Sequence, residues 1–155
     1  MRSKVSEALL VVLALILAYA TVEAQVSVKT PDDANHSPKA QKLVAAFKAG
    51  YEKKDIDALM DLVYWKNVTP QTRNGIRRSF EEVLKAPLDN VFLVSVPKSL
   101  ALEYTHGSIT YRINLEPVGW LRVFYKKNQQ GVTATSYLVG EKDGRYLIAT
   151  GAPVP

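Results

Sequence analysis

Residues 108–150 contain four runs in which apolar and polar residues alternate, and three turn signals separate these runs. In the first run, Ile109, Tyr111 and Ile113 fall on one side and Thr110 and Arg112 on the other, as in a half-buried strand. The turn signals are residues 116–119, 128–131 and 143–144. Proline and glycine at these places favour tight reversals, so the pattern predicts an antiparallel meander in which each run folds back on the previous one.

Three helices are predicted before the sheet, because three capping residues each precede an apolar period of helical spacing. Ser37 and Thr69 are hydroxyl caps followed by proline at the first helical position, and Asp55 caps a shorter helix between them. The helices are expected over about residues 38–51, 56–63 and 70–85. Their predicted buried residues are Ala40, Leu43, Val44, Phe47 and Tyr51, then Ile56, Leu59, Met60 and Val63, then Ile76, Phe80, Val83 and Leu84.

The remaining segments complete a simple order of elements. Residues 91–96 form a continuous apolar, β-branched run that predicts a buried strand, and residues 100–104 predict a short edge strand that ends in a turn at His106. Residues 151–155 are expected to be a frayed end. The whole pattern predicts an α+β fold with three N-terminal helices packed on an antiparallel β-sheet.

The first 24 residues have the pattern of a secretory signal peptide. Arg2 and Lys4 precede an apolar run over residues 8–20, and the chain then offers a small-residue cleavage site that ends at Ala24. An uncleaved anchor is the alternative, but this run of 13 residues is shorter than the roughly 20 that a spanning helix needs. We therefore expect an exported protein, periplasmic or secreted, with a flexible lead-in over residues 25–37, one domain over residues 38–155 and no membrane segment after cleavage.

Charge and composition narrow the chemistry. The net charge is +5, and the basic residues are spread along the chain. A charge of this size is usual for keeping a protein soluble, and no basic stripe indicates binding to nucleic acid. The chain has no cysteine, and its two histidines, His36 and His106, lie in the lead-in and in a turn. No catalytic triad, metal-ligand spacing or phosphate-binding loop is apparent, so no cofactor and no metal are expected.

Charged residues near the helix starts have structural explanations. Asp55 and Asp57 do not share a helix face, and carboxylates in a first turn are stabilised by the helix dipole, so they are interpreted as capping rather than catalytic residues. Arg77 and Arg78 lie four residues before acidic residues, at Glu81 and Glu82, and are expected to pair with them on the helix surface.

Two stretches resemble the nuclear transport factor two-like superfamily, also called SnoaL-like or cystatin-like. Residues 46–59, AFKAGYEKKDIDAL, resemble its first-to-second-helix junction, and residues 139–146, VGEKDGRY, resemble its terminal hairpin. The resemblance covers residues 38–150, with the family's short strand between the second and third helices reduced at most to residues 64–68. It implies a cone in which helices close over a curved sheet, often around a small apolar ligand. In that cone, Tyr51, Tyr64 and Tyr111 match the polar groups of the family's enzymes most nearly.

Two functions are compatible with these observations. The favoured one is a non-catalytic module that binds a small apolar ligand or a protein. The alternative is a cofactor-free acid/base enzyme, an isomerase or dehydratase type acting on a small hydrophobic substrate, and it requires an inward-facing carboxylate or histidine. Either would use a pocket predicted at Tyr51, Trp65, Tyr111, Ala134 and Ser136. If Phe47, Phe80 and Trp65 fill the space between sheet and helices, this pocket is absent.

A surface for a second copy is predicted on the sheet face that points away from the helices. In the run 120–126, Leu121, Val123 and Tyr125 would face inward, whereas the opposite side carries large aromatic rings beside charged residues. The predicted interface residues are Trp120, Arg122, Phe124 and, on the next strand, Tyr137. A homodimer through these rings is expected, unless the stems of Arg122 and Lys126 cover them within one chain.

Overall fold

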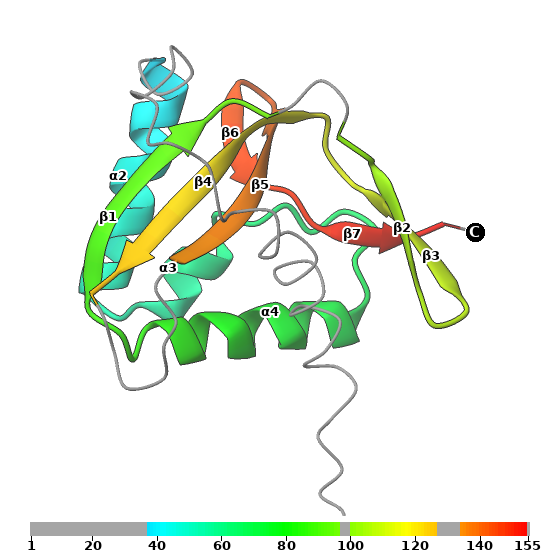
Figure 1. Cartoon of the computed structure of the whole chain (residues 1–155), viewed down its shortest axis with the longest axis horizontal. Coiled ribbons are helices and arrows are strands. Elements are labelled where there is room, and N and C mark those ends of the chain that lie inside the picture. Colours follow the sequence, from blue (N-terminus) through cyan, green and yellow to red (C-terminus); the bar gives the residue numbers. More distant parts are fainter. Residues whose placement is uncertain (1–36, 97–99, 127–133, 155) are drawn as a thin grey trace, which may run out of the picture.

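The computed structural model describes residues 37–96, 100–126 and 134–154, and Figure 1 shows their arrangement. Within these residues, three helices precede an antiparallel, strongly curved set of strands, which is an α+β fold. The helices are α2 (Pro38–Glu52), α3 (Ile56–Met60) and α4 (Pro70–Val83). The strands are β1 (Leu88–Val94), β2 (Glu103–His106), β3 (Ile109–Ile113), β4 (Pro117–Tyr125), β5 (Ala134–Lys142), β6 (Arg145–Ile148) and β7 (Gly151–Pro153). The predicted signal peptide and lead-in precede the described residues.

The three helix starts are confirmed in detail. The Ser37 hydroxyl accepts a hydrogen bond from the Ala40 N–H at 3.1 Å, and the Thr69 hydroxyl accepts one from the Thr72 N–H at 3.1 Å. Each bond satisfies a backbone donor that has no partner inside its helix. These caps fix where α2 and α4 begin, and with them the faces that the two helices present to the sheets.

The strands form two sheets rather than one. The first sheet has four strands in the order β1-β4-β5-β6, and the second sheet has three in the order β2-β3-β7. The antiparallel pairing of β4 with β5 and of β5 with β6 is confirmed, including the hairpin at Asp143 and Gly144, whose φ angles of 50° and 74° suit a tight two-residue turn. The turn predicted at residues 128–131 lies outside the described residues.

The expected reversal of the chain at residues 116–119 is wrong. Pro117 is already the first residue of β4, which pairs with β1 and β5, whereas β3 pairs with β2 and β7. Gly119 is needed for close packing and not for a turn, because a Cβ atom there would lie 2.8 Å from the Val94 carbonyl oxygen on β1. The chain therefore passes from one sheet into the other at this point.

The expected fraying of the C-terminal residues is also wrong over residues 151–154. Gly151–Pro153 forms β7 on the edge of β3, and the Val154 N–H donates to the Thr110 carbonyl at 2.8 Å. Residues 64–68 form no strand; just before them, Val63 makes a single parallel bridge to Ile148 of β6, and the Tyr64 N–H donates to the Ile148 carbonyl at 2.9 Å. Both segments are too short to show an alternating pattern, and tertiary pairing decides their conformation.

The main core lies between the helices and one face of the first sheet, which we call its inner face. Its fully buried side chains include Phe47, Phe80, Leu59, Leu93, Leu121, Val123 and Val139. The inward direction of Leu121, Val123 and Tyr125 is confirmed. On the opposite, outer face, a smaller apolar cluster contains Leu115, Leu138, Leu147 and Ala149, with Trp120 and Ile113 beside it.

The two faces of β5 are reversed relative to the prediction. Tyr137 pairs across the ladder with Leu121 and belongs to the inner face, whereas Ser136 pairs with Arg122 on the outer face. The alternation in β5 was ambiguous, since each set of alternating residues contains both apolar and small polar side chains. Only the register with β4 distinguishes them.

Candidate ligand groove

A groove lies where α4, the first sheet and the second sheet meet. α4 lies on the side of the sheet where β5 begins (Figure 1), and residues 148–151, where the chain leaves β6 for β7, also line the groove. Its lining residues come from one helix, six strands and the β6–β7 link: Thr72, Ile76, Ser79, Tyr104, Ile113, Trp120, Ser136, Tyr137, Leu138, Ile148, Ala149, Thr150 and Gly151. We call this site the groove.

The groove meets β5 along its edge. Ser136, Tyr137 and Leu138 all line it, although consecutive residues of a strand point to opposite faces of a sheet. β6 pairs only with residues 139–142 of β5, so the first half of β5 has no described strand on that side. The groove therefore borders a strand edge rather than a closed sheet face.

The lining is apolar with a few hydroxyl groups. None of the lining residues is Asp, Glu, His, Lys or Arg; Ser79, Ser136 and Tyr104 supply hydroxyls, and Trp120, Ile76 and Leu138 supply apolar surface. The pKa of Tyr104 is raised to about 12, first by burial and then by the neighbouring Tyr111, so its phenol is neutral at physiological pH. A site of this kind can exclude water and orient a ligand, but it holds no ordinary proton acceptor for catalysis near neutral pH.

The groove encloses about 80 Å³. Two larger depressions, of about 660 and 430 Å³, are shallow and lined partly by charged residues. The first lies beside the ion pair between Glu103 and Arg112, and the second lies beside Lys48 and Lys54. We therefore take the groove as the candidate site, because apolar enclosure rather than open volume provides binding energy.

The predicted cavity around Tyr51 is filled by aromatic rings. Phe47 lies 6.4 Å from Phe80 and 5.9 Å from Tyr137 between ring centroids, and Tyr51 lies 5.9 Å from Tyr125. Of the three rings in the alternative, Phe47 and Phe80 do occupy this space together with Tyr137, whereas Trp65 is only partly buried at the edge of the core. Tyr51 is a core residue. Its hydroxyl donates to carbonyl oxygens at the end of α4, with 2.6 Å to Ala86.

Two other phenols in this core lack such partners. The hydroxyls of Tyr125 and Tyr137 are buried and have no hydrogen-bond partner among the described residues. Burial raises the pKa of Tyr125 to about 12, partly offset by the Thr135 and Tyr137 side chains, and burial raises the pKa of Tyr137 well above 10. Both therefore stay neutral near pH 7. Tyr137 also lines the groove, whereas Tyr125 does not.

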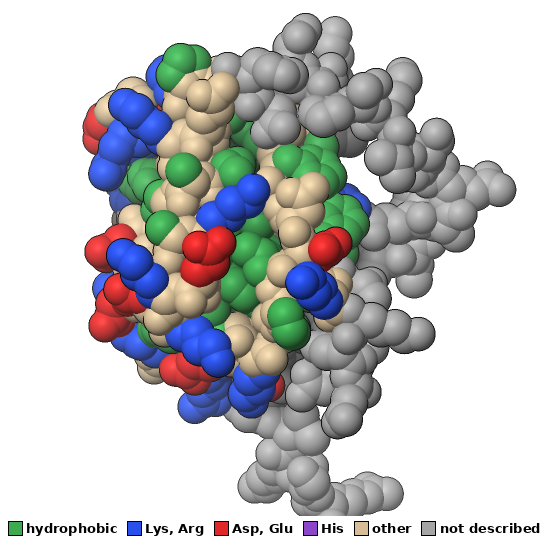
Figure 2. Space-filling model, turned by 90° about the vertical axis from the view of Figure 1, so that its left-hand side faces the viewer, with side chains coloured by type: hydrophobic (Ala, Val, Ile, Leu, Met, Phe, Trp, Pro, Cys, Tyr) green, Lys and Arg blue, Asp and Glu red, His purple; other side chains and the backbone are tan. Residues whose placement is uncertain are grey.

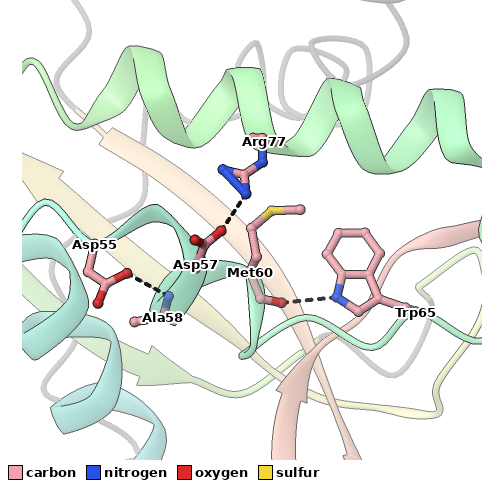
Figure 3. Close-up of polar contacts among 6 residues, drawn as sticks. All are labelled: Asp55, Asp57, Ala58, Met60, Trp65 and Arg77. Atoms are coloured by element: carbon pink, nitrogen blue, oxygen red, sulfur yellow. Dashed lines mark hydrogen bonds and ion pairs between the residues drawn. The ribbon is translucent and has the colours of Figure 1, made fainter.

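The other predicted pocket residues are dispersed. Tyr111 stacks on Tyr104 in the second sheet, with ring centroids 5.3 Å apart. Ala134 and Ser136 lie on the outer face of β5, and only Ser136 reaches the groove. Trp65 is held locally: its indole N–H donates to the Met60 carbonyl at 3.0 Å (Figure 3), and Arg73 lies over its ring.

Sequence reasoning missed most of the groove. Thr72, Ile76 and Ser79 line it from α4, and their spacing of four and three residues was a usable signal for a second helix face. Tyr104 was assigned only to an edge strand, and the link between β6 and β7 was missed. These elements meet because the strands form two sheets. The sequence analysis missed the two sheets because it predicted a reversal at residues 116–119, where the chain in fact passes from one sheet to the other.

The charged residues of α3 and α4 have one unexpected pairing. Asp55 accepts from the Ala58 N–H at 3.0 Å, as predicted for a cap, but Arg77 pairs with Asp57 across the two helices and not with Glu81 (Figure 3). Glu82 pairs with Lys85 rather than Arg78. Helix surface spacing suggested partners within α4, whereas packing of α3 against α4 brought Asp57 closer.

The predicted interface residues separate into two groups. Trp120, Arg122 and Phe124 lie on the outer face, as expected, but Tyr137 belongs to the inner face. Phe124 stacks on Phe92 of β1 at 5.5 Å, and the Arg122 guanidinium lies over the Phe124 ring at 5.9 Å. Part of this aromatic surface is therefore covered within the chain.

The charged side chains on the face that carries β1 and α2 do not form the single-sign basic patch that a polyanion site needs. Lys and Arg side chains are interspersed there with Asp and Glu (Figure 2). Within the described residues, no three His, Asp or Glu side chains are grouped so as to hold a metal ion, and none of the helices is long and apolar enough to cross a membrane.

Comparison with protein-family models finds none that matches the chain, and a search of characterised proteins finds no match. The groove and its surroundings therefore carry the functional argument alone.

Proposed function

We propose that this protein is an exported, non-catalytic binding module whose ligand site is the groove. One observation carries the proposal: the lining exposes mainly apolar surface, includes hydroxyl side chains such as those of Tyr104, Ser79 and Ser136, and has no carboxylate, imidazole, ammonium or guanidinium group. Apolar walls with a few polar groups are typical of binding sites that select by shape and hydrogen bonding.

The acid/base enzyme receives less support from this lining. Such an enzyme needs a general base poised near neutral pH within reach of its substrate. Tyr104 and Tyr137 are the titratable residues of the groove, and burial raises the pKa of both. A neutral phenol can donate a hydrogen bond to a ligand oxygen, which suits recognition, but it cannot accept a proton at that pH.

Three further parts of the proposal extend the sequence predictions. Export rests on the residues 1–24, and membership of the nuclear transport factor two-like superfamily is supported by helices that precede a curved antiparallel sheet. A homodimer through Phe124 and its neighbours on the outer face is the proposed assembly, with Tyr137 no longer part of the interface.

Binding of an apolar fluorescent probe, N-phenyl-1-naphthylamine, tests the groove. We expect saturable binding that Ser79→Phe weakens about tenfold or more, since the added ring would occupy the groove. Asn74→Phe is the matched control, because Asn74 is exposed on the same helix and does not line the groove. Absence of saturable binding, or equal binding by both variants, would contradict the proposal.

A further inference from the structure

We infer that the groove binds an extended, uncharged peptide segment, which pairs through its main chain with the free edge of β5 and inserts one apolar side chain into the groove. This inference rests on the proposed function and specifies the class of ligand. It depends on three features of the described residues: the direction of the β5 main-chain groups, the chemistry of the lining and the enclosed volume.

The main chain of β5 offers unused hydrogen-bonding groups at the groove. The Leu138 carbonyl accepts from the Ala149 N–H at 2.7 Å, so Leu138 directs its main-chain groups towards β6. Alternation along an antiparallel strand directs the N–H and C=O of Ser136 and Ala134 to the same side. β6 pairs only as far as residue 139, so no described strand reaches these groups. A row of this kind is a template for an added strand.

The lining indicates an uncharged segment. Burial of an unpaired charge is costly, and none of the lining residues could neutralise a charged side chain of a ligand. Ile76, Trp120 and Leu138 instead offer apolar contact to one side chain of a peptide. The neighbouring peptide side chains would point to the opposite side of the new strand, away from the groove.

The enclosed volume indicates one side chain rather than a whole small molecule. Pockets that enclose drug-sized ligands measure about 300–1,000 Å³, and a cavity of about 150 Å³ holds benzene. The 80 Å³ of the groove is suited to one aliphatic side chain. A larger probe such as N-phenyl-1-naphthylamine would insert only one ring and leave the others outside the enclosed part. Lining residues also come from α4 and the second sheet, and we expect these elements to hinder the sheet edge of a second folded copy more than a single strand.

The peptide acetyl-Thr-Val-Thr-Leu-Thr-Val-Thr-amide is a suitable probe. We expect its titration to shift the amide NMR signal of Ser136 and to slow hydrogen exchange of that N–H. N-methylation of the second, fourth and sixth residues, or of the third and fifth, removes donors from opposite edges of the extended peptide. One of these two analogues should bind about tenfold or more weakly and the other should bind like the parent, because only one edge faces β5.

A protein variant provides an independent test. Ser136→Pro and Ser136→Ala both lose the hydroxyl, but only Ser136→Pro also loses the N–H at the free edge, where proline is tolerated. Peptide binding should be weaker in Ser136→Pro than in Ser136→Ala, whereas N-phenyl-1-naphthylamine should bind the two variants alike. If Ser136→Pro fails to fold, the two methylated analogues still decide the question on the unaltered chain.

Each other outcome overturns the inference. Equal binding of both analogues would exclude edge pairing. Binding of the dye without the peptide would overturn the peptide assignment and leave the proposed function standing, whereas binding of neither would overturn both. Self-association that Ser136→Pro abolishes and Ser136→Ala preserves would assign the edge to a second copy instead.

Discussion

At the scale of single residues, the buried tyrosines show how one functional group can have opposite effects on stability. Tyr51 and Tyr125 are both at most 4% exposed, and their rings are neighbours in the same core. The Tyr51 hydroxyl bonds to carbonyl oxygens that follow α4, whereas the Tyr125 hydroxyl has no partner among the described residues. A satisfied buried hydroxyl stabilises the fold, and an unsatisfied one costs free energy through its desolvation.

We therefore predict that Tyr51→Phe lowers the free energy of unfolding by about 1–2 kcal/mol, because it leaves the Ala86 carbonyl without its donor. Tyr125→Phe should leave stability unchanged or raise it slightly, since the lost hydroxyl made no bond of good geometry. Urea unfolding of the two variants and the parent at neutral pH measures the difference. An equal loss in both variants would show that ring packing, and not hydroxyl pairing, decides their contributions.

The sequence was informative about residue burial but not about residue partners. The helical period placed Tyr51 on the buried face of its helix, and the alternation in residues 120–126 placed Tyr125 inward, both correctly. The acceptor of the Tyr51 hydroxyl lies 35 residues away, at Ala86. No local pattern specifies a contact at that separation, which depends on how α4 ends beside α2.

At the scale of elements, the caps were the most readable signals because they act locally. Thr69 accepts from the Thr72 N–H at 3.1 Å, and its hydroxyl also lies 2.9 Å from the Thr72 hydroxyl. The helix that begins here places Thr72, Ile76 and Ser79 along the groove. The cap therefore supports both the stability of α4 and the wall of the candidate site.

We predict that Thr69→Ala lowers the free energy of unfolding by about 1 kcal/mol, because the first turn of α4 loses its acceptor. Thr69→Ser retains the hydroxyl and should remain close to the parent. Amide hydrogen exchange should show faster opening at the start of α4 in the alanine variant alone. Matching urea curves and exchange rates for both variants would contradict the role of this cap.

Strands were harder to place than helices. The period of two identified most of their positions, but it contains no information about which strand pairs with which. Gly119 illustrates the difficulty: after Pro117 it resembles a turn residue, yet its missing side chain admits the Val94 carbonyl of β1. In β5, both sets of alternating residues could face the core, and the inner set was identified only by its register with β4.

At the scale of the whole molecule, the candidate site depends on this topology. The groove joins α4, the edge of β5 and Tyr104 of the second sheet, elements that no single stretch of sequence brings together. Of the five predicted pocket residues, Ser136 alone lines it, for a reason different from the one expected. The sequence could not predict that the lining lacks acidic and basic residues, because the set of lining residues depends on the division of the strands into two sheets.

The outer face of the first sheet remains the surface on which we expect a second copy to bind. Phe92 and Phe124 stack there with ring planes 15° apart, and Arg122 already covers part of the Phe124 ring. The area available to a partner is therefore below the roughly 150–250 Å² that each fully buried aromatic residue removes from water. Since association itself costs about 4–15 kcal/mol, we expect a reversible dimer in the micromolar range rather than a tight one.

We predict that Phe124→Ser shifts this equilibrium to the monomer, because it removes one ring of the stacked pair and exposes the other. Ile109→Ser is the matched control: Ile109 is 47% exposed, but it lies on the β2–β3 hairpin of the second sheet. Light scattering of the parent and both variants over a series of protein concentrations should show a mass that rises with concentration for the parent and for Ile109→Ser only. A parent that stays monomeric at every concentration would show that this dimer does not form and that the stacked pair belongs to the single chain. A dimer that Phe124→Ser leaves intact would show that the two copies meet through another surface.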